Sequence, residues 1–424
     1  MEIIQYPEKN IWNDILKRPA FSVKELETNV SNILEDVKAN GDAAIKKYAL
    51  QFDKVSLNTI RVSDEEIAQA IRSVSSELKN AIEMAKQNIE TFHTSQKEEI
   101  KTIETQKGVS CWRRSIGIEK VGLYIPGGSA PLFSTVLMLG VPAKLAGCKE
   151  IILCTPSDQN GKVNPAILYA ANLVGVTKIF KIGGVQAIAA MVFGTETIPK
   201  VYKIFGPGNQ YVTCAKQLIN KEGVAIDMPA GPSEVAVIAD KSCIPAFVAA
   251  DLLSQAEHGA DSQVILVSND LSVIENVNNE LDKQLKQLSR NIIAEKALKN
   301  SKAILVKTSE EGIELLNEYA PEHLIIACEN EEVLADKVIN AGSVFLGNYS
   351  CESAGDYASG TNHTLPTNGY AKAYSGVSLD SFVKKVTFQK LTKEGIQTIG
   401  RTIELMAEAE GLDAHKNAVS IRLK

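Results

Sequence analysis

The spacing of apolar residues divides the chain into three regions. Between residues 22 and 105, apolar side chains such as Ile67 and Ile71 recur at helical spacing among many Glu, Lys, Ala and Gln residues. From Val121 onward, short continuous apolar runs alternate with helical segments, a pattern typical of a buried parallel sheet. Beyond residue 370 a long helical segment follows. We therefore expect N-terminal helices, an α/β region and a C-terminal tail.

The α/β region repeats one strand–helix rhythm, so we expect two successive units, 109–232 and 233–370. Strands of the first unit are expected at 121–125, 150–154, 178–182, 201–205 and near Val224. Those of the second are expected at 235–239, 263–267, 303–306, 324–327 and 343–346. The other regions are 1–108, helical and able to pack on the second unit, and 371–424, with a helix at 392–409 and a final strand at 419–423.

The composition limits the classes of protein to consider. Of 424 residues, 45% are hydrophobic and 23% are charged, as in soluble globular proteins of two or three domains. The net charge of −6 disfavours nucleic acid or an anionic membrane as partner, and no apolar run reaches the ~18 residues of a membrane span. The first residues lack a signal-peptide pattern, so we expect a cytoplasmic protein. Seven scattered cysteines without a Cys-x-x-Cys pair disfavour disulfides and a thiolate zinc site.

Four of the five histidines lie in the second half of the chain, each in a short polar cluster. Imidazole binds zinc and moves protons near neutral pH, so these clusters favour an enzyme. Gln255 and His258 share one face near the end of a helix, as two ligands of one metal ion must. A polar helix end that faces solvent would have the same sequence pattern and is the alternative. Glu322 and His323 stand at the mouth of a buried strand and suit a general acid/base pair. Because adjacent strand residues point to opposite faces, both reach one substrate only if the backbone there is irregular or if they act from different sides.

Three further positions carry weaker signals. Asp356 and His363 lie in a loop of small and polar residues, 353–366, of the kind in which functional sites concentrate. Ser233, at the end of a proline-containing linker, would face the cleft between the two units. His93 has no polar cluster around it and is expected to be a surface or packing residue.

The first unit contains three glycine turns that follow strands and precede helices: 124–131, 183–187 and 206–209. Such crossings are where α/β sheets place ligands, and the following helix N-terminus offers N–H groups to a pyrophosphate. Ordinary tight turns are the alternative. None matches Gly-x-Gly-x-x-Gly, because Tyr211 occupies the last position, so a standard dinucleotide fingerprint is absent.

Together these segments resemble the histidinol dehydrogenase family. The matching stretches run in the same order from about residue 110 to the C-terminus: 121–131, 204–209, 227–234, 252–259, 320–323, 353–366 and 414–417. The first hundred residues match only in helical character. The resemblance implies two incomplete Rossmann-like parallel-sheet units, related to the aldehyde dehydrogenase architecture, which agrees with the missing fingerprint.

The resemblance also implies zinc-dependent, NAD-linked oxidation of L-histidinol to L-histidine through L-histidinal, the final steps of histidine biosynthesis. The implied zinc ligands are Gln255, His258, Asp356 and His415, and the implied catalytic pair is Glu322 and His323. The NAD site would include Tyr124, Gln186 and Asn209. Substrate contacts would add Ser233, His363 and Glu410 to the zinc ligands and the catalytic pair. His415 is similar to a ligand donated by the neighbouring subunit, so a homodimer with shared sites is implied, with 371–424 at its interface.

The residue types suit this chemistry. His323 could take the alcohol proton as hydride leaves, and Glu322 could activate the water that adds to the aldehyde. A cysteine thiohemiacetal is disfavoured, because neither Cys111 nor Cys148 lies beside a histidine in the sequence. Tyr202 departs from the family, in which Asp is frequent, and we expect it to lie at the surface.

Two other classes of function remain open from the residues alone. A zinc hydrolase on an α/β scaffold could bind metal through His258, Asp356 and His415 and use Glu322 as base. It would have no need of three glycine turns in the first unit. A non-catalytic binding protein would have no use for the pair of Glu322 and His323.

Overall fold

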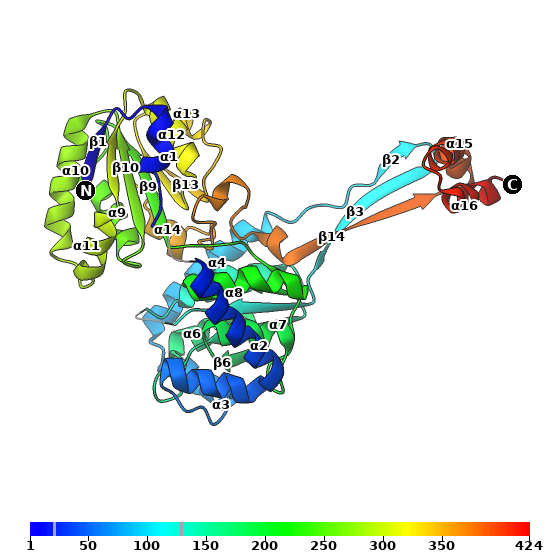
Figure 1. Cartoon of the computed structure of the whole chain (residues 1–424), viewed down its shortest axis with the longest axis horizontal. Coiled ribbons are helices and arrows are strands. Elements are labelled where there is room, and N and C mark those ends of the chain that lie inside the picture. The colour runs from blue at the N-terminus through cyan, green and yellow to red at the C-terminus, as the bar shows by residue number, and fades with distance from the viewer. Residues whose placement is uncertain (20–22, 128–129) are drawn as a thin grey trace.

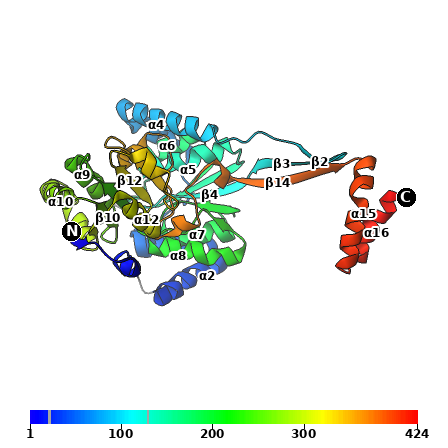
Figure 2. The same ribbon diagram turned by 90° about the horizontal axis from the view of Figure 1, so that it is seen from above.

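The computed structural model describes residues 1–19, 23–127 and 130–424. Two α/β units lie side by side, and a long arm carries the C-terminal helices away from both (Figures 1 and 2). Each unit is built around its own parallel sheet, as the alternating pattern predicted.

The first unit contains a five-stranded parallel sheet with the strand order β6-β5-β4-β7-β8. Its strands are β4 (Lys120–Tyr124), β5 (Glu150–Thr155), β6 (Lys178–Lys181), β7 (Lys203–Phe205) and β8 (Ala225–Ile226). Its helices are α5 (Phe133–Leu145), α6 (Pro165–Val174), α7 (Gly184–Phe193) and α8 (Gln210–Leu218). Helices cover both faces, so all but the first residue of β5 are buried, which explains its continuous apolar run.

The second unit contains a six-stranded parallel sheet with the strand order β1-β11-β10-β9-β12-β13. Its strands are β1 (Glu2–Gln5), β9 (Glu234–Ala239), β10 (Gln263–Ser268), β11 (Lys302–Leu305), β12 (His323–Ala327) and β13 (Ser343–Leu346). Its helices are α1 (Trp12–Ile15), α9 (Pro245–Ala256), α10 (Leu271–Leu285), α11 (Asn291–Lys299), α12 (Ser309–Tyr319), α13 (Glu331–Ala335) and α14 (Glu352–Tyr357). The edge strand β1 was not expected from the sequence.

The N-terminal region is shared between the two units. Only β1 and α1 join the second unit, where we expected the region to pack. The helices α2 (Val23–Tyr48), α3 (Asp64–Ser73) and α4 (Ser76–Thr94) instead cover the first unit, with α2 against α7 and α8, α3 against α6, and α4 against α5. The physical reason is a shared core, in which Val30 and Val37 of α2 pack with Ile188 of α7.

The arm is a three-stranded antiparallel sheet with the order β14-β3-β2, tipped by two helices (Figure 1). Its elements are β2 (Ile103–Gln106), β3 (Val109–Gly117), β14 (Val383–Leu391), α15 (Lys393–Ala409) and α16 (Asp413–Leu423). The expected final strand at 419–423 is therefore wrong. Its alternating apolar residues suggested a strand, but Val419 and Leu423 are one helical turn apart, and Leu423 packs over Gly400 of α15.

Short 3-10 and π turns complete the described parts of the chain: Lys9–Ile11, Ala49–Asp53, Ile219–Glu222, Tyr370–Lys372 and Leu379–Phe382. Over the same residues, no helix has both the length and the apolar character that crossing a membrane would require. Tyr202, just before β7, lies at the surface as expected and is about half exposed.

Candidate active site

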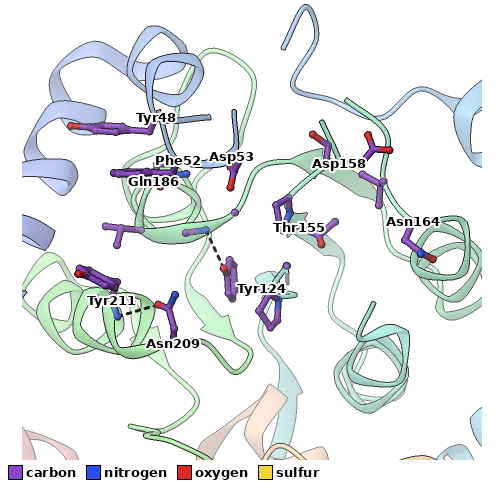
Figure 3. A pocket seen from close by; sticks show the side chains of 18 of the residues that line it. Tyr48, Phe52, Asp53, Tyr124, Thr155, Asp158, Asn164, Gln186, Asn209 and Tyr211 are labelled. Carbon is purple, nitrogen blue, oxygen red and sulfur yellow. Dashed lines mark hydrogen bonds between the residues drawn. The ribbon is translucent and has the colours of Figure 1, made fainter. Parts of the chain in front are cut away.

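A large cavity opens in the first unit where the strand order reverses. β4 lies between β5 and β7, so the connections on its two sides diverge and leave a crevice at the carboxyl ends of the strands. The cavity has a volume of about 1230 Å³, and Tyr124, Gln186 and Asn209 all line it (Figure 3). The structure therefore brings together the three residues that we expected at a cofactor site.

The glycine turns shape this cavity by close backbone contact. Tyr124 ends β4, and its hydroxyl accepts a hydrogen bond of 3.0 Å from the backbone N–H of Gly184. Gly206 has a φ of +129°, and a Cβ atom there would lie 2.0 Å from the carbonyl oxygen of Tyr124. Asn209 caps α8 by accepting hydrogen bonds from the next turn. Burial raises the pKa of Tyr124 to about 12, so its hydroxyl remains protonated.

One wall of the cavity comes from the N-terminal region and was not predicted. Tyr48, Phe52 and Asp53 face Tyr124 and Asn209 across it (Figure 3). The rings of Tyr48 and Phe52 stack with centroids 5.5 Å apart. The sequence offered no signal here beyond helical periodicity, because the π turn Ala49–Asp53 sets which side chains point inward.

A second group of functional side chains gathers at the amino edge of the second sheet. Glu322 and His323 are both buried at the start of β12, and α9 returns to the same edge carrying Gln255. Glu322 Oε2 lies 3.8 Å from Nδ1 of His323. Glu322 precedes the first residue of β12, and Ala320 has a left-handed φ of +52°, so the backbone just before the strand is irregular.

Hydrogen bonds from neighbouring residues fix the positions of Glu322 and His323. The backbone N–H of Glu234 donates to Glu322 Oε2 at 3.0 Å, and Nδ1 of His323 lies 2.8 Å from Nε2 of Gln255. Burial raises the pKa of Glu322 to about 8. Burial by itself would lower the pKa of His323, but the carboxylates of Glu322 and Asp356 outweigh it and raise that pKa.

Potential metal ligands lie directly beside the pair. His258, Glu352 and Asp356 each offer a ligand atom within 4.8 Å of the others. Among the residues that the structure describes, Oε1 of Gln255 and Nε2 of His323 are buried polar atoms with no hydrogen-bond partner. Buried polar groups are normally satisfied, so these two atoms fit a site that binds a metal or a substrate.

Glu352 was missed in the sequence, although a signal for it exists. It precedes Asp356 by four residues on α14, so the two carboxylates lie on one helical face. Ser254 donates a hydrogen bond of 3.2 Å to its Oε2 atom, and burial raises the pKa of Glu352 to about 8.

The buried cluster around Glu322 and His323 and the cavity are neighbours across the two units. His363 contacts the backbone oxygen of Asp356 at 2.9 Å through Nδ1, and its Nε2 lies 3.0 Å from Oγ1 of Thr135. Thr135 belongs to the first turn of α5, and Pro131, just before that helix, lines the cavity. Ser233 lies half-buried next to Glu234, at the same edge as the pair.

Two expected site residues are not brought to this cluster within the protomer. Glu410 and His415 are both exposed, and they lie at the end of α15 and in the first turn of α16. These helices form the tip of the arm, far from the second unit in both views (Figures 1 and 2).

A ligand-sized cavity at a sheet crossover, beside a buried carboxylate–histidine pair with adjacent metal-ligating groups, defines a two-unit enzyme of the α/β class. The family model for histidinol dehydrogenase matches residues 16–423. The chain belongs to the histidinol dehydrogenase family, and it is an oxidoreductase.

Individual relatives agree with this assignment. Histidinol dehydrogenase of Bacteroides thetaiotaomicron is 62% identical over 423 residues, which cover 100% of this chain and 99% of that protein. The enzyme of Pectobacterium atrosepticum is 54% identical, with 96% and 92% covered. The crystal structure of histidinol dehydrogenase from Elizabethkingia anophelis superposes with a TM-score of 0.97 at 61% identity, over 100% of this chain and 98% of that chain.

Proposed function

We propose that this chain oxidises L-histidinol to L-histidine through L-histidinal, in two NAD-linked steps that depend on zinc, as the final steps of histidine biosynthesis. The observation that carries the proposal is the buried pair of Glu322 and His323, set between metal-ligating groups and a large cavity. The names of the relatives give the substrate class.

The donor groups fit a zinc ion. Gln255, His258 and Asp356 of one subunit would hold it, completed by His415 of a second copy of this chain. The unpartnered Oε1 of Gln255 supports this assignment, because a buried amide oxygen is otherwise costly to leave unsatisfied. When bound, zinc would act as a Lewis acid and orient nitrogen ligands of the substrate. These donors lack a thiolate, which suits imidazole and amine nitrogen atoms of histidinol.

His323 is the proposed base for the alcohol. Its Nδ1 lies 2.8 Å from Nε2 of Gln255 and 3.3 Å from the backbone oxygen of Glu234, so both contacts fall on this one ring nitrogen. Nε2 is the ring nitrogen that is buried without a partner, so it is the proposed atom that takes the proton. His323 therefore takes the hydroxyl proton in the first oxidation.

Glu322 is the proposed base for the second oxidation. The aldehyde must add water before it can lose a second hydride, and a carboxylate whose pKa is raised by burial accepts a proton effectively near neutral pH. Its Oε2 is fixed by Glu234, so the carboxylate is oriented before water arrives. Asp356, His363 and Ser233 would contact the substrate, with Glu410 of the second copy.

The cavity of the first unit is the proposed NAD site, lined by Tyr124, Gln186 and Asn209. When bound there, NAD would accept the hydride in each oxidation. The hydrogen bond between Tyr124 and Gly184 supports a preformed site, since it fixes the turn that leads into α7.

A homodimer with shared sites is part of the proposal. The arm places the exposed residues Glu410 and His415 far from the two α/β units of the same chain. A dimer in which each arm reaches the site of the partner explains this position. We also propose a cytoplasmic location, because all seven cysteines are unpaired thiols, as a reducing compartment favours.

Cysteine catalysis of the aldehyde step remains disfavoured. The thiol of Cys148 points to the backbone oxygen of Phe382 at 3.8 Å, and burial raises its pKa to about 11. Cys111 lies on β3 of the arm. A thiol with a raised pKa is a poor nucleophile.

The direct test supplies purified protein with L-histidinol and NAD and counts NADH against bound zinc. We expect two NADH per histidinol, lost on chelation and restored by zinc. Zinc-containing protein that forms no NADH would overturn the proposal and revive the hydrolase alternative.

A further inference from the structure

We infer that Arg18 is a positioning residue for the reaction: it clamps Glu234, whose backbone holds both Glu322 and His323. The inference rests on the proposed function only for the roles of those two residues. Arg18 lies in the N-terminal segment, more than 200 positions before any of the residues that it contacts.

The backbone of Glu234 contacts both members of the catalytic pair. Its N–H donates to Oε2 of Glu322 at 3.0 Å, and its carbonyl oxygen lies 3.3 Å from Nδ1 of His323. β9 and β12 are adjacent parallel strands, with Val235 opposite His323. A shift of Glu234 would therefore misplace the general base of each oxidation at once.

The side chain of Glu234 is fixed by a two-pronged ion pair. Nε and Nη2 of Arg18 donate to the two carboxylate oxygens at 2.5 and 2.9 Å. The backbone N–H of Asn368 adds a third hydrogen bond, of 2.8 Å. The Glu234 side chain is only 3% exposed and that of Arg18 18%, so solvent screens this pair weakly.

The same guanidinium also holds the turn that leads into the catalytic pair. Nη2 of Arg18 donates to the backbone oxygen of Tyr319 at 2.7 Å, and the guanidinium carbon lies 4.0 Å from the centroid of the Tyr319 ring. The next residue, Ala320, has the left-handed φ of +52°. A non-glycine residue keeps this conformation only where its surroundings enforce it. Arg18 thus fixes both sides of the pair, β9 through Glu234 and the turn through Tyr319.

Stability alone is a weak reason for such a pair. Removing two charges from water costs about as much as their attraction returns, and apolar side chains often serve as well. Orientation is the better reason, because a misplacement of about 1 Å at a reacting group can reduce turnover about a hundredfold.

The test compares Arg18→Lys with the wild-type enzyme. Lysine keeps the charge but cannot form the planar two-pronged contact while also bonding the Tyr319 oxygen. We expect kcat to fall about 10- to 100-fold in both half-reactions, while the KM values for histidinol and NAD and the zinc content change by less than about twofold. Arg113→Lys is the control, since Nη2 of Arg113 contacts both oxygens of Glu98 at an exposed site.

Arg18→Ala allows a chemical-rescue experiment. We expect ethylguanidinium to restore part of the lost kcat in Arg18→Ala, with no gain for wild type or Arg113→Lys. If Arg18→Lys folds poorly, as judged by its thermal midpoint and zinc content, Glu234→Gln replaces it. The isosteric amide keeps the backbone contacts of residue 234 but loses the negative charge. We expect kcat to fall less in Glu234→Gln than in Arg18→Lys.

Three outcomes would overturn the inference. Unchanged kcat in both Arg18→Lys and Glu234→Gln would do so, as would a loss confined to KM, or a lack of guanidinium rescue in folded, zinc-loaded Arg18→Ala. A wild-type protein that forms no NADH would overturn the proposed function itself, and the role of Arg18 with it.

Discussion

His258 and His415 belong to parts of the protomer that lie far from each other. His258 follows α9 in the second unit, and His415 lies in the first turn of α16 at the tip of the arm (Figures 1 and 2). Two side chains placed in this way can bind one metal ion only if His415 comes from another copy of the chain. The arm therefore links the proposed catalysis to assembly.

Mixing two inactive variants tests this link. His258→Ala and His415→Ala should each be inactive alone. After subunit exchange in an equal mixture, half of the dimers contain one subunit of each kind and carry one intact site, so activity should recover to about a quarter of wild type. NADH formation measures the recovery. No recovery, despite exchange proven by differently tagged subunits, would place each site within one chain.

Substitutions of the two proposed catalytic residues should affect the two oxidation steps differently. His323→Ala should reduce both oxidations by about 10²- to 10⁴-fold, because the alcohol and the hydrated aldehyde each lose a hydroxyl proton as hydride leaves, and His323 is the proposed base. Glu322→Gln should impair aldehyde oxidation more than alcohol oxidation, so that aldehyde accumulates and a trapping reagent detects it. Glu310→Gln, exposed on α12, is a matched control. Equal loss in both half-reactions of Glu322→Gln would contradict its role as the activator of water.

The sheets were predictable because buried parallel strands are continuous apolar runs. All ten expected strands of the two units are present, whereas the edge strand β1 has polar Glu2 and Gln5 at its ends and gave no such signal. Helical periodicity reveals an apolar face but not the surface that covers it, so the packing of α2 on the first unit could not be predicted.

Local spacing likewise predicted only part of the candidate site. Gln255 near the end of α9 and His258 just after it are three positions apart, and adjacent Glu322 and His323 mark a strand end. The contact of Arg18 with Glu234 joins residues 216 positions apart, so no pattern in the local sequence predicts it. Tertiary contacts of this kind hold the site in place, and only the folded structure reveals them.

Glu352 should contribute to metal binding. Its carboxylate and the ligand atoms of His258 and Asp356 all lie within 4.8 Å of one another, so Glu352→Gln should weaken zinc binding by about 10- to 100-fold. Competition with a chromogenic chelator measures this without reference to activity. Glu329→Gln provides the control. Unchanged zinc affinity in a folded Glu352→Gln variant would show that Glu352 only packs beside the site.

Two glycines with positive φ should differ sharply on substitution. Gly206→Ala would place a Cβ atom 2.0 Å from the backbone oxygen of Tyr124, so we expect a loss of about 3 kcal/mol or more in unfolding free energy and weaker NAD binding. Gly223→Ala, with a φ of +77° and no atom within 4 Å of the new Cβ, should cost only about 1 kcal/mol of backbone strain. Urea unfolding and NAD titration compare the two variants. Similar losses in both would contradict the close contact at Gly206.

The buried His93 should make stability depend on pH. It is a packing residue with no exposed surface, its Nδ1 contacts the backbone oxygen of Ile89 at 2.9 Å, and its Nε2 lies 3.4 Å from Nδ2 of Asn362, next to His363. Burial lowers the pKa of His93 below its usual value of 6.5, despite the opposing hydrogen bond to Ile89.

The direction of this pH dependence follows from the linkage between proton binding and folding. Below about pH 6.5, His93 binds a proton in the unfolded chain but remains neutral in the folded protein. The contribution of His93 to the unfolding free energy is therefore full above that pH and is lost as the pH falls toward the folded pKa. The slope from one such group is at most about 1.4 kcal/mol per pH unit. His93→Gln should remove it, so its unfolding free energy, measured in urea between pH 7.5 and 5.5, should fall less than that of wild type. Parallel curves for wild type and His93→Gln would refute a neutral, buried His93.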